Sequence, residues 1–411
     1  MLTADTGHSL LRGMDTPLNY KGKIIELEGL RGLAILLVTF HHFWPATGTF
    51  YNFMAPLAHL GWIGVDLFFV ISGLLIGGIL LDTRGAEGYF QKFYIRRILR
   101  IFPLYYALVV SLFIVVPLGQ AFLHDVSYQQ TEFVQESGGP FWYLLFAGNI
   151  REAITGVEPA YFLAPLWSIS IEEQFYLLSP LLISSLSLQQ LKYVLLGFMA
   201  FAPLFRLTMI EIQPDNERIQ YLATLSRLDN LSVGVLLALL IRTSTTMPRK
   251  ETTLIVAIVL GFILGAAFFL GGLDRTTWFC RVFGYSLLAA FFGAVVLWAL
   301  QSRSQAQASF LRSKWLVYLG GLCYGLYLLQ RPAEIFLLKV TSSIGIDLEE
   351  YPFISLASKT VFSVFVAYLS WHCFEKPINN MKKRFQSAGH PLEQKAIHNT
   401  PLPAPCPEMR S

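Results

Sequence analysis

Charged residues are scarce in this chain. Only 14% of its 411 residues are charged, whereas 54% are hydrophobic. A soluble globular protein carries about 25% charged residues, so an ordinary soluble fold is excluded and an all-α polytopic membrane protein is predicted. The net charge is only +4, which gives no indication of nucleic-acid binding.

Cysteine is also scarce, with four residues scattered at Cys280, Cys323, Cys373 and Cys406. No two of them have the close spacing of a metal-binding pair, and their pattern implies no disulfide framework. We therefore expect no metal site and interpret the four as ordinary packing thiols.

The two ends of the chain lack long apolar runs. Residues 1–23 are polar and predict a flexible N-terminal segment without the features of a signal peptide. Residues 385–411 are rich in proline and poor in apolar residues, which predicts a disordered tail. One membrane domain is expected between them, at residues 24–384.

Apolar stretches near 20 residues recur along the chain and predict about ten transmembrane helices. They fall at 27–45, 60–82, 101–118, 164–187, 193–212, 223–241, 253–273, 278–300, 315–338 and 353–374. An eleventh stretch, 141–150, is about half a bilayer long. If it crossed, Arg242, Arg249 and Lys250 would be exported, against the positive-inside rule. We therefore predict that residues 119–163 lie wholly outside and that both termini are cytoplasmic.

The first predicted span carries Arg31 and His42, eleven residues apart. At about 100° per residue the two side chains share one helix face, roughly 16 Å apart, with His41 about 80° away. An arginine and a histidine in a span indicate a functional site facing a protein interior or a wet cavity. The alternative is that Arg31 reaches the headgroups and the histidines end the helix.

The second predicted span contains Asp66 and three glycines, Gly61, Gly64 and Gly73. Glycines at these positions allow helices to approach closely. A carboxylate in an apolar helix needs a partner. Asp66 is therefore predicted to orient His42 by accepting its ring N–H, or else to form a structural ion pair.

An arginine cluster follows, in what is interpreted as an inner loop at 94–103. Arg96 and Arg100 share a helix face, and Arg97 is three residues from Arg100. Clustered guanidiniums suit phosphates through bidentate hydrogen bonds. Ordinary cytoplasmic charge or binding of lipid headgroups is the alternative.

Two adjacent carboxylates, Glu172 and Glu173, stand near the start of the fourth predicted span. They point about 100° apart, so one can face a cavity while the other pairs elsewhere. Trp167 and Tyr176 suit a membrane interface or a sugar-stacking surface. The alternative is an N-terminal cap, with Ser168 followed by acidic residues at the positive end of the helix dipole.

Three later segments add weaker signals. The sixth span opens with Arg227 and Asp229, which suggests an outer ion pair, and the ninth contains Tyr324. Residues 371–377, which end the last span, are most simply an interfacial anchor.

Taken together and in this order, these segments resemble the integral-membrane acyltransferase-3 family, over about residues 22–380. The matching blocks are 26–32, the Arg31 to His42 spacing, 64–73, 96–103, 167–176 and 375–377. The resemblance implies O-acylation of sugars, lipids, peptidoglycan or antibiotics, an acyl-CoA donor that is usually acetyl-CoA, and Arg31 with His42 as the characteristic pair. It also implies a bacterial cytoplasmic (inner) membrane protein.

The chain departs from the family pattern at three positions. Glu28 replaces the more usual aspartate, and Pro165 and Gln330 stand where many members have histidine. The last two departures put the acceptor class in doubt and leave His42 as the better candidate base.

The resulting hypothesis is direct transfer of an acyl group from acyl-CoA to a hydroxyl of a glycan, lipid or metabolite. His42 is the expected general base, Arg31 a donor-side contact, and Asp66 and Glu172 orienting groups. The expected substrate contacts are Arg96, Arg97, Arg100, Glu173, Trp167, Arg227 and Tyr324. The alternatives are a polysaccharide or lipid transporter that uses the same charges, and an inactive scaffold. The oligomeric state is left open.

Overall fold

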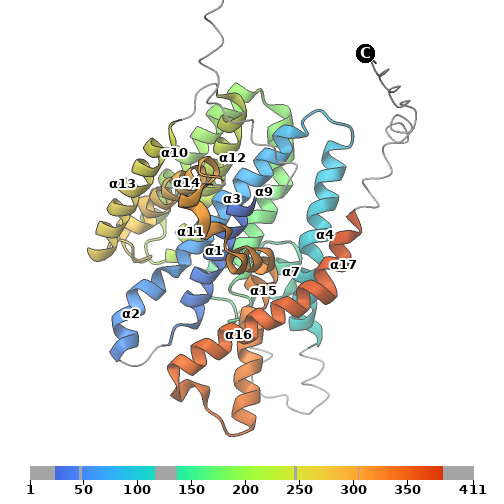
Figure 1. Ribbon diagram of the computed structural model, residues 1–411, viewed down its shortest axis with the longest axis vertical. Coiled ribbons are helices and arrows are strands. Elements are labelled where there is room, and N and C mark those ends of the chain that lie inside the picture. Colours follow the sequence, from blue (N-terminus) through green and yellow to red (C-terminus); the bar gives the residue numbers. More distant parts are fainter. Residues whose placement is uncertain (1–23, 46–48, 116–136, 245–247, 304, 383–411) are drawn as a thin grey trace, which may run out of the picture.

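The computed structural model describes residues 24–45, 49–115, 137–244, 248–303 and 305–382. The predicted terminal segments, 1–23 and 385–411, lie outside the described residues, as do residues 119–136. Throughout the described residues the secondary structure is helical, which confirms the all-α prediction (Figure 1).

Within the described ranges no sheet lies between the α-helices. In chain order they are α1 (Ile25–Phe43), α2 (Thr49–His59), α3 (Gly64–Asp82), α4 (Tyr89–Val110), α7 (Pro140–Leu144), α8 (Gly148–Thr155), α9 (Leu166–Ser185), α10 (Leu188–Ile212), α11 (Glu217–Leu222), α12 (Leu228–Thr243), α13 (Lys250–Phe269), α14 (Tyr285–Gln301), α15 (Lys314–Ser343), α16 (Pro352–Ser370) and α17 (Lys376–Asn380).

Seven helical segments of the described chain are long and apolar enough to cross a membrane. They are Met54–Asp82, Tyr89–Ile114, Leu188–Ile212, Thr224–Thr243, Lys250–Phe269, Cys280–Gln301 and Pro352–Asn380. The protein is therefore a polytopic membrane protein. Three further helices, α1, α9 and α15, coincide with predicted spans and have 19, 20 and 30 residues. The total of ten spans and the cytoplasmic termini stay predictions.

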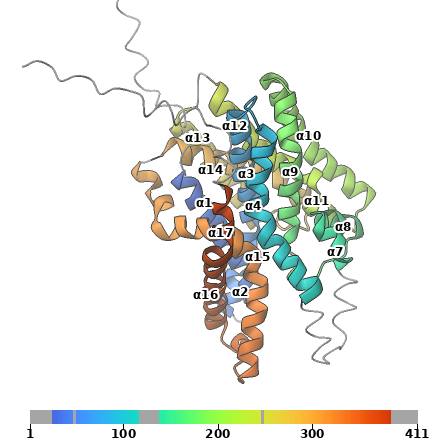
Figure 2. The ribbon, with the colours of Figure 1, turned by 90° about the vertical axis from the view of Figure 1, so that its right-hand side faces the viewer.

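The short apolar stretch at 141–150 forms two helices instead of one. The helices α7 and α8 have 5 and 8 residues, and Phe146 between them has a positive φ of 51°. Neither helix is long enough to cross a bilayer, in agreement with the interpretation that this stretch is not a span. Figure 2 shows both beside the lower end of α4, where Tyr105 donates a hydrogen bond of 2.9 Å to the carbonyl of Tyr143.

The arginine cluster does not lie in a loop, so that prediction is wrong. Helix α4 begins at Tyr89 and continues through all three arginines, with Pro103 inside it. Buried Phe93 and Ile101 lie on either side of the cluster. Because the inward-facing apolar residues keep helical spacing through the basic stretch, the helix forms there although the sequence is locally charged.

Glycines let the central helices approach closely. Helix α3 packs against α12, and α1 packs against α15. A Cβ atom on Gly73 would lie 2.2 Å from the carbonyl oxygen of Leu231, and one on Gly61 would lie 2.2 Å from that of Leu37. The predicted close approach at the glycines of the second span is confirmed, and it brings α3 to the centre of the bundle (Figure 1).

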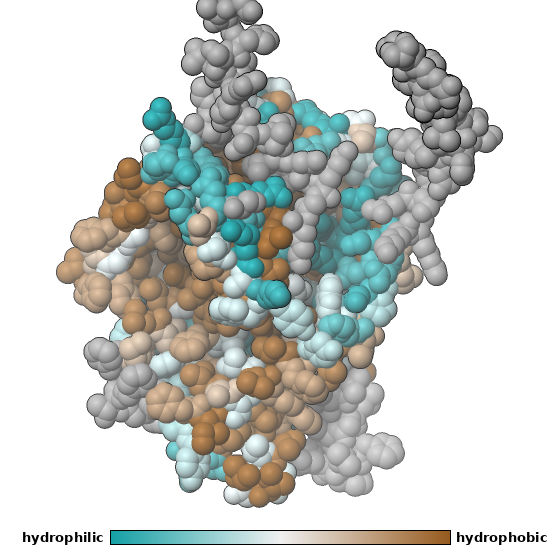
Figure 3. Space-filling model, viewed as in Figure 1, coloured by the Kyte–Doolittle hydropathy of each residue, from teal (hydrophilic) through white to brown (hydrophobic). Residues whose placement is uncertain are grey.

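The outer surface is rich in apolar side chains. Figure 3 shows hydrophobic residues over much of the face in view and hydrophilic ones gathered toward its upper end. Phe262 of α13 and Val361 of α16 are among the most exposed apolar residues. Such a surface suits contact with lipid chains, whereas the polar groups described next lie inside the bundle.

Candidate active site

Polar side chains line two separate cavities inside the bundle. The first, called the Arg31 cavity, is formed mainly by α1, α3, α4, α9 and α15. Its polar lining residues are Arg31, Ser72, Arg97, Arg100, Ser168, Glu172, Tyr176, Cys323, Tyr324 and Tyr327. It measures about 100 Å³.

The second cavity, called the His42 cavity, lies at the other end of α1. It measures about 480 Å³. Its polar and aromatic lining residues are His41, His42, Trp62, Glu152, Glu158, Trp167, Glu217, Arg218, Tyr221, Asp274, Arg275, Thr276, Tyr327 and Arg331. Val65 and Tyr327 line both cavities and so form a partition between them.

The two cavities explain the spacing seen in the first helix. Arg31 and His42 share a helix face, and that face meets the Arg31 cavity at one position and the His42 cavity at the other. His41 also lines the His42 cavity. His41 therefore belongs to the site although it lies about 80° from the Arg31–His42 face, because a cavity at a helix end can be lined by side chains from several sides of the helix.

Arg31 is held by two neighbours. Its guanidinium lies 3.3 Å from a carboxylate oxygen of Glu28, one turn earlier, and it donates a hydrogen bond of 3.0 Å to the sulfur of Cys323. Cys323 thus lines the Arg31 cavity and contacts its characteristic arginine. Cys323 also packs in the apolar core, as the interpretation as a packing thiol expects.

Only two residues of the arginine cluster reach the cavity. Arg97 and Arg100, three apart on α4, line it, whereas Arg96 is absent from the lining. The Arg97 guanidinium lies 5.9 Å from the centre of the Tyr176 ring, and its buried Nε has no hydrogen-bond partner. Neither cavity arginine is within 4 Å of a carboxylate of the described residues. The role of Arg96 as a substrate contact stays a prediction.

Glu172 and Glu173 take different positions, as their 100° separation predicts. Glu172 lines the Arg31 cavity and accepts a hydrogen bond of 3.1 Å from Tyr176, whose hydroxyl is also 2.5 Å from that of Ser72. Glu173 lies outside the lining of both cavities, and one of its buried oxygens has no partner. Its prediction as a substrate contact finds no support in this geometry.

The capping alternative for these residues is wrong. Helix α9 begins at Leu166 after Pro165, without a hydrogen bond from a capping side chain. Ser168 is instead 2.7 Å from the hydroxyl of Tyr327, at the partition. Trp167 lines the His42 cavity and packs on Tyr221, with ring centres 4.7 Å apart. Its role as a sugar-stacking surface stays a prediction.

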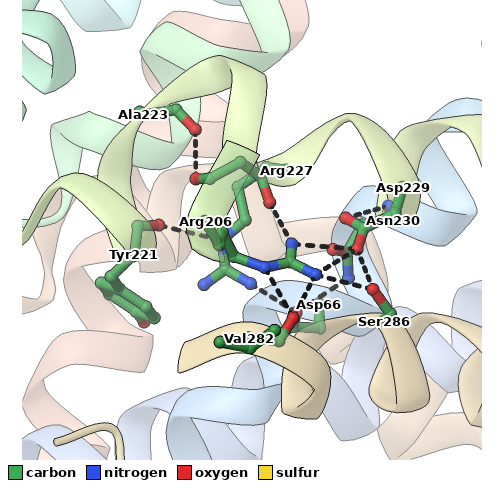
Figure 4. A network of polar contacts seen from close by, with 10 residues as sticks. Asp66, Arg206, Tyr221, Ala223, Arg227, Asp229, Asn230, Val282 and Ser286 are labelled. Carbon is green, nitrogen blue, oxygen red and sulfur yellow. Dashed lines mark hydrogen bonds and ion pairs between the residues drawn. The ribbon is translucent and has the colours of Figure 1, made fainter. Parts of the chain in front are cut away.

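Asp66 does not orient His42, so the predicted catalytic role is wrong. One Asp66 oxygen accepts hydrogen bonds of 2.9 Å from Arg227 and 2.8 Å from Asn230 (Figure 4). The structural ion pair, which was the alternative, is what forms. Gln330, which stands where many family members have histidine, accepts a hydrogen bond of 3.3 Å from Thr39 and donates one of 3.2 Å to the carbonyl of Tyr327.

The predicted pair of Arg227 with Asp229 is also wrong. Figure 4 shows a crossed arrangement, in which Arg227 pairs with Asp66 of α3 and Arg206 of α10 pairs with Asp229 at 3.0 Å. Ser286 of α14 donates a further hydrogen bond of 2.6 Å to Asp229. Arg227 is fully buried and lines neither cavity, so it belongs to the packing of these helices and not to a substrate contact.

The wide end of the His42 cavity carries charges in the short helices. Arg218 of α11 forms ion pairs with Glu152 of α8 and, at 2.7 Å, with Glu158. Burial raises the pKa of Glu152 to about 7, against the opposing effect of Arg218. This carboxyl therefore titrates near neutral pH, within the cavity that holds His42.

Several cavity residues escaped the sequence reasoning, among them Ser72, Cys323, Tyr327 and Arg331. Tyr327 lies three residues after Tyr324, which was predicted and does line the Arg31 cavity. Spacing of one helical turn from Tyr324 would have indicated Tyr327. A single serine or cysteine in an apolar span carries no comparable signal.

Comparisons with known proteins agree with these features. The Acyl_transf_3 family, described as an acyltransferase domain, matches residues 24–372. Over 365 residues the chain is 28% identical to YrhL of Bacillus subtilis, provisionally named a peptidoglycan O-acetyltransferase, covering 86% of this chain and 54% of YrhL. It is 28% identical over 327 residues to the peptidoglycan O-acetyltransferase OatA of Listeria monocytogenes, covering 75% of this chain and 49% of OatA.

A third relative is SACOL0978 of Staphylococcus aureus, provisionally named an O-acetyltransferase. It is 29% identical over 327 residues, which cover 74% of this chain and 49% of the relative. The chain thus spans about half the length of the curated relatives it matches. No solved structure matches the chain significantly. The transporter alternative gains no support from these relatives, which are all named acetyltransferases.

Proposed function

This chain belongs to the Acyl_transf_3 family, and on that premise we propose that it is an O-acetyltransferase of the bacterial inner membrane. It moves an acetyl group from acetyl-CoA to a hydroxyl of a glycan. The observation that carries the proposal is the pair of cavities that meet at Val65 and Tyr327, one lined by arginines and the other by His42.

The Arg31 cavity suits the donor. Arg97 and Arg100 are cationic, lack ion pairs among the described residues, and come from successive turns of one helix, so they can bind CoA phosphates. In this proposal the Arg31 cavity, the smaller of the two, holds the acetyl-thioester end of the donor. The phosphates then lie at the mouth of the cavity, with the thioester pointing toward the partition.

The His42 cavity suits the acceptor. It is the larger of the two, and Trp167 and Tyr221 give it the aromatic wall on which sugar rings pack. Neutral His42 takes the proton of the acceptor hydroxyl, and the oxygen attacks the thioester carbonyl carbon. The carbon–sulfur bond breaks, and the CoA thiolate leaves and regains a proton.

Arg31 acts from the donor side in this scheme. Its contacts with Glu28 and Cys323 keep it in the Arg31 cavity, away from the ring of His42. It stabilises negative charge that develops on the thioester oxygen or binds the pantetheine end of the donor. Glu172, which lines the same cavity, orients this end through Tyr176 and Ser72.

Peptidoglycan is the first acceptor to test, because OatA and YrhL are named for it. The experiment is release of free CoA by the purified full chain in lipid nanodiscs, with acetyl-CoA and solubilised peptidoglycan glycan strands. We expect release that depends on both substrates, together with ester-linked acetate on the glycan by mass spectrometry. Transport of glycan without CoA release would overturn the proposal.

A further inference from the structure

Positive charge is concentrated around His42 itself. Arg331 and Arg275 both line the cavity that holds it. The proposed transfer chemistry does not need this local field, because a neutral imidazole suffices to take a hydroxyl proton. The positive charge near His42 therefore needs another explanation.

Arg331 is placed firmly but is not fully neutralised. Its guanidinium lies 3.9 Å from the centre of the Tyr161 ring and donates hydrogen bonds of 3.3 Å to the His42 carbonyl and to Glu334. Its buried Nε has no hydrogen-bond partner. Glu334 also lies 3.1 Å from the amine of Lys359, which is itself 3.1 Å from Glu349, so Arg331 shares its carboxylate partner with a second cation.

Arg275 is the second cation and is free of ion pairs among the described residues. It is exposed in the turn after α13, and its guanidinium lies 5.0 Å from the centre of the Tyr221 ring. Tyr221 in turn packs on Trp167. An arginine beside two aromatic rings that pack on each other is a suitable place for a sugar that bears an anionic group.

The acidic residues of the same cavity are mostly engaged elsewhere. Glu152 and Glu158 are paired with Arg218. Asp274 accepts hydrogen bonds of 2.9 and 2.8 Å from the backbone and the hydroxyl of Thr276. Glu217, at the start of α11, is exposed. The cations nearest His42 are therefore the groups available to a ligand.

We infer that the His42 cavity selects an anionic acceptor, a saccharide whose carboxylate or phosphate binds Arg331, with Arg275 assisting, so that a neighbouring hydroxyl lies at His42. This inference rests on the proposed function and adds the class of acceptor to it. A bidentate contact between guanidinium and carboxylate fixes both distance and orientation, which is what placing one hydroxyl among several against the imidazole requires.

The test uses matched acceptors and the full chain in nanodiscs with saturating acetyl-CoA. One acceptor is peptidoglycan glycan strands freed of peptide, whose lactyl carboxylates are ionised, and the other is the same strands after methyl esterification. Glucose 1-phosphate beside glucose tests the phosphate arm. CoA release gives KM and kcat for each. For the wild type we expect esterification to raise KM about 10-fold, the value of one charge-assisted hydrogen bond.

Substitutions then show which arginine causes the preference for the ionised acceptor. Arg331→Gln should raise KM for the ionised strands about 10-fold, with little change for the esterified ones, and Arg331→Lys should restore part of the loss. Arg275→Gln, at an exposed position, should raise KM less, about 3-fold. Lys339→Gln is the matched control, because this exposed residue on the same helix lines neither cavity.

Each outcome decides between the two proposals. If the wild type acetylates ionised and esterified strands, and the phosphorylated and plain sugars, with equal KM, the inference is overturned while the proposed function stands. If no acceptor gives CoA release, the proposed function fails and the inference with it. Should Arg331→Gln fail to fold by size-exclusion chromatography, Arg275→Gln decides, and an unchanged preference in that variant counts against the inference.

Discussion

Two sets of arginines lie among the helices, and they differ in what neutralises them. Arg206 and Arg227 are fully buried, and each lies within 3.0 Å of an aspartate. Arg97 and Arg100 line a cavity and have no carboxylate of the described residues within 4 Å. An unpaired charge inside a membrane costs several kcal/mol. The first set therefore holds helices together, and the second is available to an anionic ligand.

The largest expected effect on catalysis comes from replacing His42, the proposed general base. His42→Ala should lower kcat for acetyl transfer about 100-fold or more, because it removes the proposed general base and little packing surface. His41→Ala should be milder, since the proposed base, His42, remains in the same cavity. The measurement is CoA release by purified variants whose membrane insertion is checked by size-exclusion chromatography. Wild-type activity in His42→Ala would refute the mechanism.

The paired arginines should respond in stability and not in kinetics. Asp66→Asn leaves Arg227 buried without its countercharge, which costs about 3–5 kcal/mol of folding free energy. The double variant Asp66→Asn with Arg227→Met should recover much of this loss, because replacing both members of a buried pair is often neutral. Thermal unfolding in detergent measures both. Folded Asp66→Asn protein should keep the wild-type KM for acetyl-CoA.

A loss confined to kcat in Asp66→Asn, with unchanged thermal stability, would contradict this assignment. Such a result would mean that Asp66 contributes to the reaction, as the sequence-based prediction of an orienting carboxylate held, in addition to its ion pair with Arg227.

The unpaired arginines should affect binding of the donor. Arg97→Gln and Arg100→Gln should each raise KM for acetyl-CoA about 10-fold, because each removes a charge-assisted contact to phosphate that is present in both ground and transition states. The KM for the acceptor should stay within error. Titration of acetyl-CoA at fixed glycan, and the reverse, separates the two constants. If only the KM for the acceptor changed, the Arg31 cavity would be the acceptor site, and our assignment of it to the donor would be wrong.

The sequence predicted features that depend on residues close together in the chain, and it missed contacts between residues far apart in the chain. The shared face of Arg31 and His42 was predictable because helical periodicity is local, and both residues line cavities as that face requires. The partner of Asp66 was not, because Arg227 is 161 residues away and meets it only through the packing of α3 on α12.

Adjacency in sequence was also misleading. Arg227 and Asp229 are close along the chain, but residues two apart on a helix point in different directions, so each found a partner on another helix. Cys323 gave no signal, because one thiol in an apolar span has no pattern, and its contact with Arg31 joins residues 292 apart. Long-range pairing of polar groups depends on which helices become neighbours, and hydropathy alone does not determine that.

The smallest expected effect on KM comes from replacing Arg96, which lies within about one helix turn of Arg97 and Arg100. Arg96 shares a helix face with Arg100 in the sequence, yet only Arg97 and Arg100 line the cavity. A cation outside the cavity acts through solvent, where salt screens it. Arg96→Gln should therefore change KM for acetyl-CoA by less than about twofold, and any change should disappear at high ionic strength. A salt-resistant 10-fold rise would show that the donor site extends beyond the cavity, and that the cavity lining does not separate binding arginines from ordinary surface charge.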